Sequence, residues 1–178
     1  MSNKKPSKKT NASNTKKEAI ILLGHGSRVP DAARNMKKTA ERLKEKHGYA
    51  MVKICFMSRL GPHFPKVFEY CVSMGAAKVL VIPYFLHMGL HLLLDIPKMM
   101  QQEGQKYPQV ELVLGKGLGY DELLVDLVHS CIQKSQHEKD VRDIILPPEE
   151  KFPIPQGQYE FVPMTPEEAA KYKRKPHG

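Results

Sequence analysis

Residues 19–28, AIILLGHGSR, decide the fold of this chain. The apolar run from Ala19 to Leu23 is typical of a buried parallel strand, and it ends at Gly24-His25-Gly26-Ser27, just before a helical pattern. In open α/β sheets the carboxyl ends of the strands form the crevice where ligands bind. Glycine on each side of His25 allows a tight turn and leaves the imidazole uncrowded. We therefore expect function at His25, at the end of the first strand.

The rest of the chain repeats this alternation of strand and helix. Further strands are predicted at residues 50–57, 78–85 and 110–114, with Pro83 near a strand end because it cannot donate to the ladder. Helices are predicted at residues 30–48, 62–75 and 121–136. After residue 85 a loop is predicted to lead into a further helix that runs towards Gln105. The helix at residues 62–75 should face inward through Val67, Phe68, Cys71, Val72 and Met74. The helix at residues 121–136 should face inward through Leu123, Leu124, Leu127, Val128, Cys131 and Ile132. The alternation indicates right-handed crossovers and a parallel sheet covered on both faces.

Charge and composition divide the chain into three parts. The formal charge of +9 is uneven, because six lysines and no acidic residue lie within residues 1–17. We interpret residues 1–17 as a disordered basic arm, residues 18–138 as a single α/β domain, and residues 139–178 as a proline-rich tail. The folded part is only mildly basic, which argues against nucleic acid as its partner. The lysine arm alone supports the rival interpretation of a nucleic-acid or membrane-surface binder.

The targeting and redox signals predict a cytoplasmic protein. The amino terminus has no apolar segment of the kind found in secretory signals, and no run of eighteen apolar residues occurs that could span a membrane. The three cysteines, Cys55, Cys71 and Cys131, are odd in number, lack C-x-x-C spacing and lie within apolar patterns. We expect all three to be buried, reduced thiols.

Two motifs make the sequence specific. G-H-G-S-R follows the first strand at residues 24–28, and I-P-Y-F-L-x-x-G-x-H-x-x-x-D-I-P follows the third at residues 82–97. Together they resemble the small class II chelatases of the CbiX type, which insert cobalt or iron into sirohydrochlorin for cobalamin or sirohaem synthesis. The resemblance covers about residues 18–135. It implies a three-layer, chelatase-like α/β domain with a four-stranded parallel sheet in the order 2-1-3-4.

The resemblance assigns the chemistry to one histidine in each motif, His25 and His91, as catalytic residues and metal ligands. Neutral imidazole binds first-row divalent metals and also accepts protons, and metal insertion must remove two pyrrole N–H protons. The metal, Co²⁺ or Fe²⁺ with Ni²⁺ as a further candidate, is then a substrate, and no organic cofactor is expected. His87 precedes His91 by four residues and is a third candidate ligand, against the alternative of an exposed loop histidine.

The chain departs from the family at one position. These chelatases usually carry a glutamate in the pattern F-[LM]-E-x-x-x-P. Residues 56–62 of this chain read FMSRLGP, so Ser58 stands at the position of that glutamate. A serine hydroxyl is a poor metal ligand and is not a base at neutral pH. A metal-binding or metallochaperone module without turnover is therefore the alternative function. His63 and His87 are close enough in sequence to compensate for the missing acid.

Several polar residues near the motifs are candidates for binding the substrate. Sirohydrochlorin carries eight carboxylates, which suit the guanidinium groups of Arg28 and Arg59 and the hydroxyls of Ser27 and Ser58. Capping of the first helix is the alternative role for Ser27, and Asp95 is expected to fix the junction between loop and helix. A single G-H-G-S motif resembles the short form of the family, which implies a homodimer with the cleft near its interface.

Overall fold

Four parallel strands form one sheet in the order β2-β1-β3-β4. This is a computed structural model that describes residues 17–148 and Lys151. The strands are β1 (Glu18–Gly24), β2 (Val52–Phe56), β3 (Lys78–Pro83) and β4 (Glu111–Leu114). The predicted strand order and parallel direction are confirmed, and Pro83 is the last residue of β3. Because β1 pairs with both β2 and β3, the first motif lies at the middle of the sheet.

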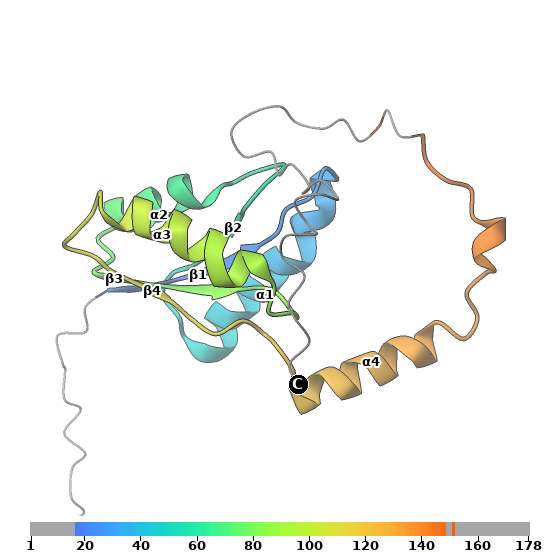
Figure 1. The fold of residues 1–178 in the computed structure, drawn as a ribbon. Coiled ribbons are helices and arrows are strands. Elements are labelled where there is room, and N and C mark those ends of the chain that lie inside the picture. Colours follow the sequence, from blue (N-terminus) through green and yellow to red (C-terminus); the bar gives the residue numbers. More distant parts are fainter. Residues whose placement is uncertain (1–16, 149–150, 152–178) are drawn as a thin grey trace, which may run out of the picture.

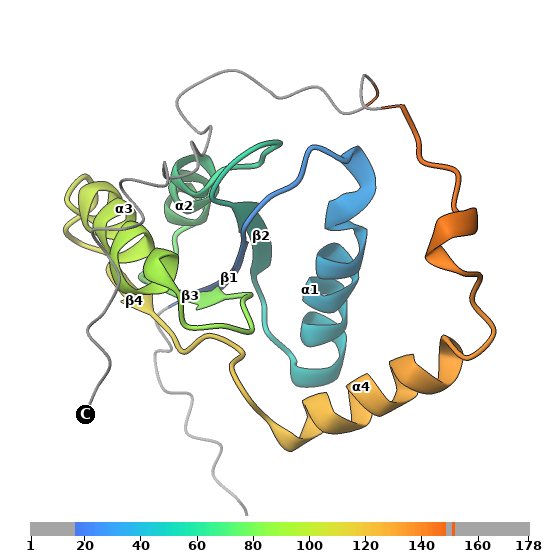
Figure 2. The same ribbon diagram turned by 45° about the vertical axis from the view of Figure 1, so that its right-hand side comes forward.

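Helices on both faces of the sheet make three layers. One face carries the 3-10 turn η1 (Pro30–Ala33) and α1 (Arg34–His47), and the other carries α2 (Phe64–Ser73) and α3 (Ile96–Gly104), as Figures 1 and 2 show. The remaining elements are the π-helical turn η2 (His91–Asp95), α4 (Glu122–Lys134) and η3 (Val141–Asp143). α1 ends as predicted at Gly48, whose φ of 73° closes the helix in the left-handed conformation.

The strand β1 is buried on both faces, so its side chains divide between two apolar layers. Ala19, Ile21 and Leu23 belong to the layer under α2 and α3, where the rings of Phe64 and Phe68 stack with centroids 5.6 Å apart. The residues between them face α1 and pack with Met36, Ala40 and Val52. This period of two explains why the first strand reads as an unbroken apolar run.

Three expectations about packing are wrong. Met74 is 48% exposed because α2 ends at Ser73, which leaves Met74 as a cap residue off the inward face. Cys55 and Cys71 are buried as predicted, whereas Cys131 is exposed. Cys131 lies on α4, which buries none of its residues because it projects away from the sheet (Figures 1 and 2). The predicted inward face of α4 is therefore not buried within the described part of the chain.

The outer parts of the chain lie largely beyond the described residues. Residues 1–16 of the predicted basic arm, and residues 149–150 and 152–178 of the predicted tail, are outside them. The boundaries of the predicted domain at residues 18 and 138 remain predictions. Among residues 17–148 and 151, no helix combines the length and the apolar character needed to cross a membrane.

Candidate functional site

His25 and His91 come together at the carboxyl edge of the sheet. Their ring centroids are 5.4 Å apart, and the ring planes are inclined at 62° in an edge-to-face arrangement. His25 is exposed on the loop after β1, and His91 is half-buried at the start of η2, beyond β3. Because β1 and β3 are neighbours in the sheet, the segments that follow them meet at one edge. The expected meeting of the two motifs is confirmed.

A local widening of the helix sets the position of His91. Pro97 has no N–H group, and a proline ring inside an α-helix clashes with the carbonyl four residues earlier, here that of Leu93. The chain takes a π-helical turn instead, in which the N–H of Ile96 donates to the carbonyl of His91, five residues earlier. This turn has His91 at its first position and Asp95 at its last.

Asp95 fixes the protonation pattern of the His91 ring. Nδ1 of His91 lies 2.7 Å from Oδ2 of Asp95, and an ionised carboxylate can only accept a hydrogen bond. Nδ1–H is therefore the donor, and Nε2 carries the lone pair of the neutral ring. The sequence indicated only that Asp95 fixes a junction. The H-x-x-x-D spacing on a helix is the signal that could have predicted this contact.

The backbone of the His25 loop is bonded to the loop that follows β2. Met57 N donates to Gly24 O at 3.0 Å, and Ser58 N donates to His25 O at 3.1 Å, so pairing continues beyond the end of the sheet. Gly26 has a φ of +109°, and a Cβ at this position would lie 2.0 Å from the carbonyl oxygen of Ser58. Gly26 is therefore required by the close approach of the second loop as well as by the turn.

Ser58 lies beneath His25 and is only 3% exposed. Its hydroxyl donates to the backbone carbonyl of His25 at 3.1 Å, in addition to the bond made by its own N–H group. The resemblance places Ser58 among the residues that contact the substrate, but the structure buries the hydroxyl and engages it with backbone. Its contacts suit a residue that positions His25. A glutamate here would need room for a buried carboxylate or a different loop path.

The other candidates surround this pair of loops. Arg28 is exposed, and Arg59 is half-buried with a φ of 66°. The hydroxyl of Ser27 accepts from Val29 N at 3.0 Å, so it closes a turn, and it does not cap the first helix. His87 is exposed on the loop before η2. In the part of the chain that the structure describes, no group of three or more His, Cys, Asp or Glu residues could hold a metal ion.

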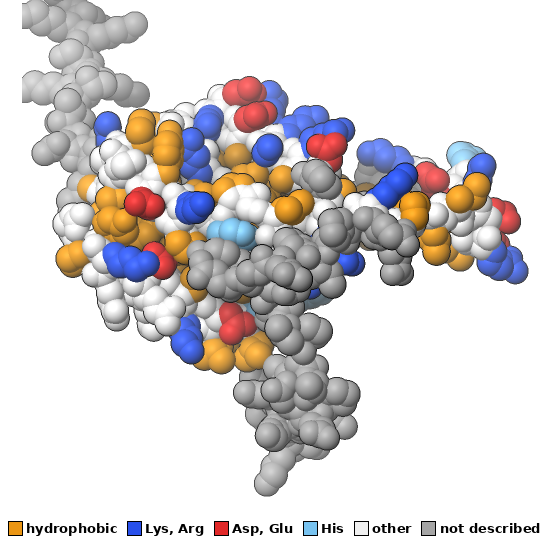
Figure 3. Space-filling view, turned by 90° about the horizontal axis from the view of Figure 1, so that it is seen from above, with side chains coloured by type: hydrophobic (Ala, Val, Ile, Leu, Met, Phe, Trp, Pro, Cys, Tyr) orange, Lys and Arg blue, Asp and Glu red, His pale blue; other side chains and the backbone are white. Residues whose placement is uncertain are grey.

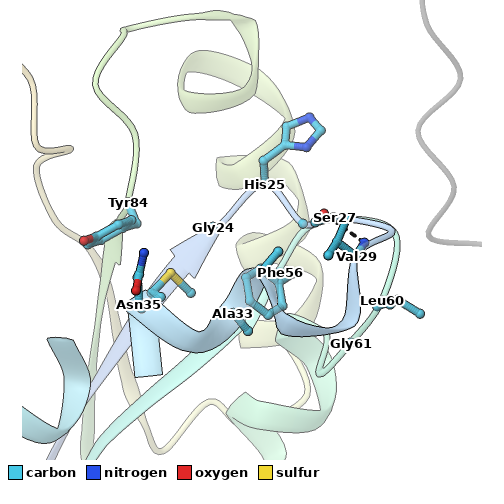
Figure 4. Close-up of a pocket in the computed structure, with 13 residues that line it drawn as sticks. Gly24, His25, Ser27, Val29, Ala33, Asn35, Phe56, Leu60, Gly61 and Tyr84 are labelled. Atoms are coloured by element: carbon cyan, nitrogen blue, oxygen red, sulfur yellow. Dashed lines mark hydrogen bonds between the residues drawn. The ribbon is translucent and has the colours of Figure 1, made fainter. Parts of the chain in front are cut away.

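A pocket of about 270 Å³ opens beside the His25 loop. Its wall includes the apolar side chains of Val29, Met36, Phe56 and Leu60, and Figure 4 shows the His25 ring pointing away from Phe56. Asn35 on α1 and Tyr84 after β3 lie near each other at its other end (Figure 4). The sequence reasoning missed both: Tyr84 follows a predicted strand, but nothing in the pattern of α1 singled out Asn35.

Comparisons with known proteins agree with this geometry. The profile of the CbiX family matches residues 19–135. The sirohydrochlorin ferrochelatase of Priestia megaterium is 30% identical over 129 residues, which are 72% of this chain and 48% of that protein. The sirohydrochlorin cobaltochelatase of Methanococcus maripaludis is 32% identical over 136 residues, covering 62% of this chain and 94% of that protein.

A solved structure shares the fold. The sirohydrochlorin chelatase SirB from Bacillus subtilis subspecies spizizenii, in complex with cobalt, gives a TM-score of 0.62 at 31% identity and covers 66% of this chain and 50% of its own. The present chain thus spans about half the length of the Priestia and Bacillus proteins. The family profile matches well over half of the chain, and both of its histidine motifs lie inside the matched segment. This chain therefore belongs to the CbiX family.

Proposed function

We propose that this protein inserts a divalent metal ion, Co²⁺ or Fe²⁺, into a sirohydrochlorin-type tetrapyrrole. The proposal is carried by the imidazoles of His25 and His91, whose centroids are 5.4 Å apart at the open edge of the sheet. Imidazole binds first-row divalent metals and accepts protons near neutral pH. Relatives named as iron or cobalt chelatases of sirohydrochlorin support the same substrate class. Ni²⁺ is a third metal to be tested.

The two rings can divide the work of insertion. Entry of a divalent cation into the macrocycle releases two pyrrole protons, so the site needs a metal ligand and a proton acceptor but no electron donor. Nε2 of His91 can bind the metal or accept one of the two protons, the other proton passes to solvent, and the Asp95 carboxylate 2.7 Å from Nδ1 holds the ring in the orientation that this requires. His25, exposed at the adjacent loop, then holds or delivers the metal. The reaction requires no organic cofactor.

Residues on the paired loops would orient the macrocycle. Arg28 and Arg59 flank the His25 loop and can bind substrate carboxylates through paired N–H donors. Ser27 can contribute its hydroxyl at the same loop, whereas Ser58 acts through its bonds to the backbone of His25. His87 is proposed as a further metal ligand during delivery, because it is exposed on the loop leading to His91.

An insertion assay with the full chain tests this function. Sirohydrochlorin is mixed with Co²⁺, Fe²⁺ or Ni²⁺, and the change in its absorption spectrum is followed with and without protein. We expect the wild-type protein to accelerate insertion, and His25→Ala and His91→Ala to lose most of that acceleration. His129→Ala on the exposed face of α4 serves as the matched control. Tight metal binding without acceleration would contradict the proposal and favour a metal-binding module.

A further inference from the structure

One flank of α1 carries a groove whose side chains are mainly polar or positively charged. The groove has a volume of about 420 Å³, and its lining includes Asn35, Lys38, Thr39, Arg42, Leu43 and Lys46. These positions recur at intervals of three and four residues, so they share one side of the helix. Leu43 is half-buried and is the only apolar side chain of the lining. A groove of this composition suits a charged ligand.

The charge of the groove is positive. Lys38 and Lys46 are exposed, and neither forms an ion pair within the described part of the chain. Nη1 of Arg42 lies 2.6 Å from Oε2 of Glu45, so this neighbouring acid offsets part of the arginine charge. Among the described residues, no Asp or Glu lines the groove itself. On the face of the molecule that Figure 3 shows, by comparison, Lys and Arg side chains lie interspersed with Asp and Glu. We therefore expect the groove to attract anions.

The groove adjoins the pocket beside His25. Asn35 lines both of them, and it lies near Tyr84 at the far end of the pocket (Figure 4). The pocket has a volume of about 270 Å³, whereas pockets that enclose drug-sized molecules measure about 300–1,000 Å³. A whole tetrapyrrole therefore does not fit inside the pocket. Part of a macrocycle seated at His25 must lie outside it, and the groove on α1 is a surface that continues from the pocket.

We propose that this groove binds carboxylates of the acidic tetrapyrrole and guides the macrocycle to His25. The inference rests on the proposed function, and it adds a substrate site that lies outside the two histidine motifs. Lys38 and Lys46 are eight residues apart, about 12 Å along the helix axis, so they can meet carboxylates on different rings of one macrocycle. Asn35, at the junction with the pocket, can donate its amide N–H to a further carboxylate.

Binding of metal-free sirohydrochlorin to the full chain, followed by the change in its fluorescence, tests the groove without any insertion step. Lys38→Gln combined with Lys46→Gln removes two charges from the groove. We expect the Kd of this double variant to rise about tenfold at low ionic strength, the lower end of the range that electrostatic attraction covers. At 1 M salt the Debye length is about 3 Å, so the variant and the wild type should differ by less than about twofold.

A matched control removes the same charge from another side of α1. Lys37 and Lys44 are exposed on this helix but do not line the groove. Lys37→Gln combined with Lys44→Gln should therefore bind sirohydrochlorin nearly as tightly as the wild type at either salt concentration. All four lysines are exposed, so circular dichroism should show both double variants folded.

Insertion kinetics with saturating Co²⁺ separate the groove from the histidines. The groove variant should raise the KM for sirohydrochlorin and leave kcat unchanged, because the groove contacts no reacting atom, whereas His25→Ala should lower kcat. A wild-type protein that binds sirohydrochlorin through Lys38 and Lys46 but does not accelerate insertion would uphold the groove and contradict the proposed function. Equal Kd values for the two double variants, or no binding of sirohydrochlorin by the wild type, would overturn the groove assignment.

Discussion

The contact between Asp95 and His91 offers the sharpest test of the site. Asp95→Ala removes the acceptor that holds Nδ1–H of His91, whereas Asp95→Asn keeps a carbonyl oxygen in its place but removes the charge. Loss of such a partner typically weakens metal affinity or activity by about 10–100-fold. The two side chains are 24% and 39% exposed, so solvent screens part of the interaction. We therefore expect the metal affinity to fall about tenfold in Asp95→Asn and by a larger factor in Asp95→Ala.

Two measurements distinguish orientation of the ring from general damage. Titration with Co²⁺ gives the metal affinity, and ¹⁵N chemical shifts of the His91 ring give the fraction of molecules protonated at Nδ1. We expect Asp95→Ala to lower both, and Asp143→Asn, a matched substitution in η3, to change neither. A tenfold loss corresponds to about 1.4 kcal/mol. If Asp95→Ala binds Co²⁺ as tightly as the wild type and keeps its Nδ1 proton, the assigned role of Asp95 is refuted.

Three further predictions concern the histidines, the loop glycine and the buried thiols. His25→Ala and His91→Ala should each slow insertion by ~10²–10⁴-fold, the range for a general base, and a loss below threefold would count against this role. Gly26→Ala should lower the melting temperature clearly, because its Cβ would lie 2.0 Å from Ser58 O, whereas Gly89→Ala has open space and should not. Burial raises the pKa of the Cys71 thiol from 9.0 to about 11, so the contribution of this thiol to stability is fully present below pH 9. The free energy of unfolding should therefore fall as the pH rises from 9 to 11. In urea unfolding experiments the Cys71→Ala variant should show a smaller decrease in the free energy of unfolding over this pH range. A decrease as large as that of the wild type would contradict the raised pKa of Cys71.

The fold was largely predictable because local patterns and packing agree. The run from Ala19 to Leu23 is buried on both faces of a central strand, which only a doubly covered sheet provides. Gly48 and Pro83 mark the ends of α1 and β3 for simple backbone reasons. The strand order needed the family resemblance, because periodicity shows which residues are buried without showing which strands are neighbours.

The sequence predicted that His25 and His91 lie at the same edge of the sheet, but it did not predict the contacts that support them. The two motifs indicated His25 and His91, and the parallel sheet brought them to one edge. The role of Ser58 depended on the path of the loop after β2, which pairs with the His25 loop and turns the serine hydroxyl toward the backbone. Sequence spacing places a residue in a loop, but the hydrogen bonds between two loops decide which side chains reach the crevice.

The prediction for α4 failed for a different reason. Its apolar positions recur with helical spacing, and this correctly indicates a helix with one face to bury. Periodicity cannot tell whether the covering surface belongs to the same chain or to another molecule, because both produce the same pattern. In the structure Gly115 N and Leu118 N donate to Val81 O and Phe85 O, and α4, which begins four residues after Leu118, buries none of its residues within the described chain.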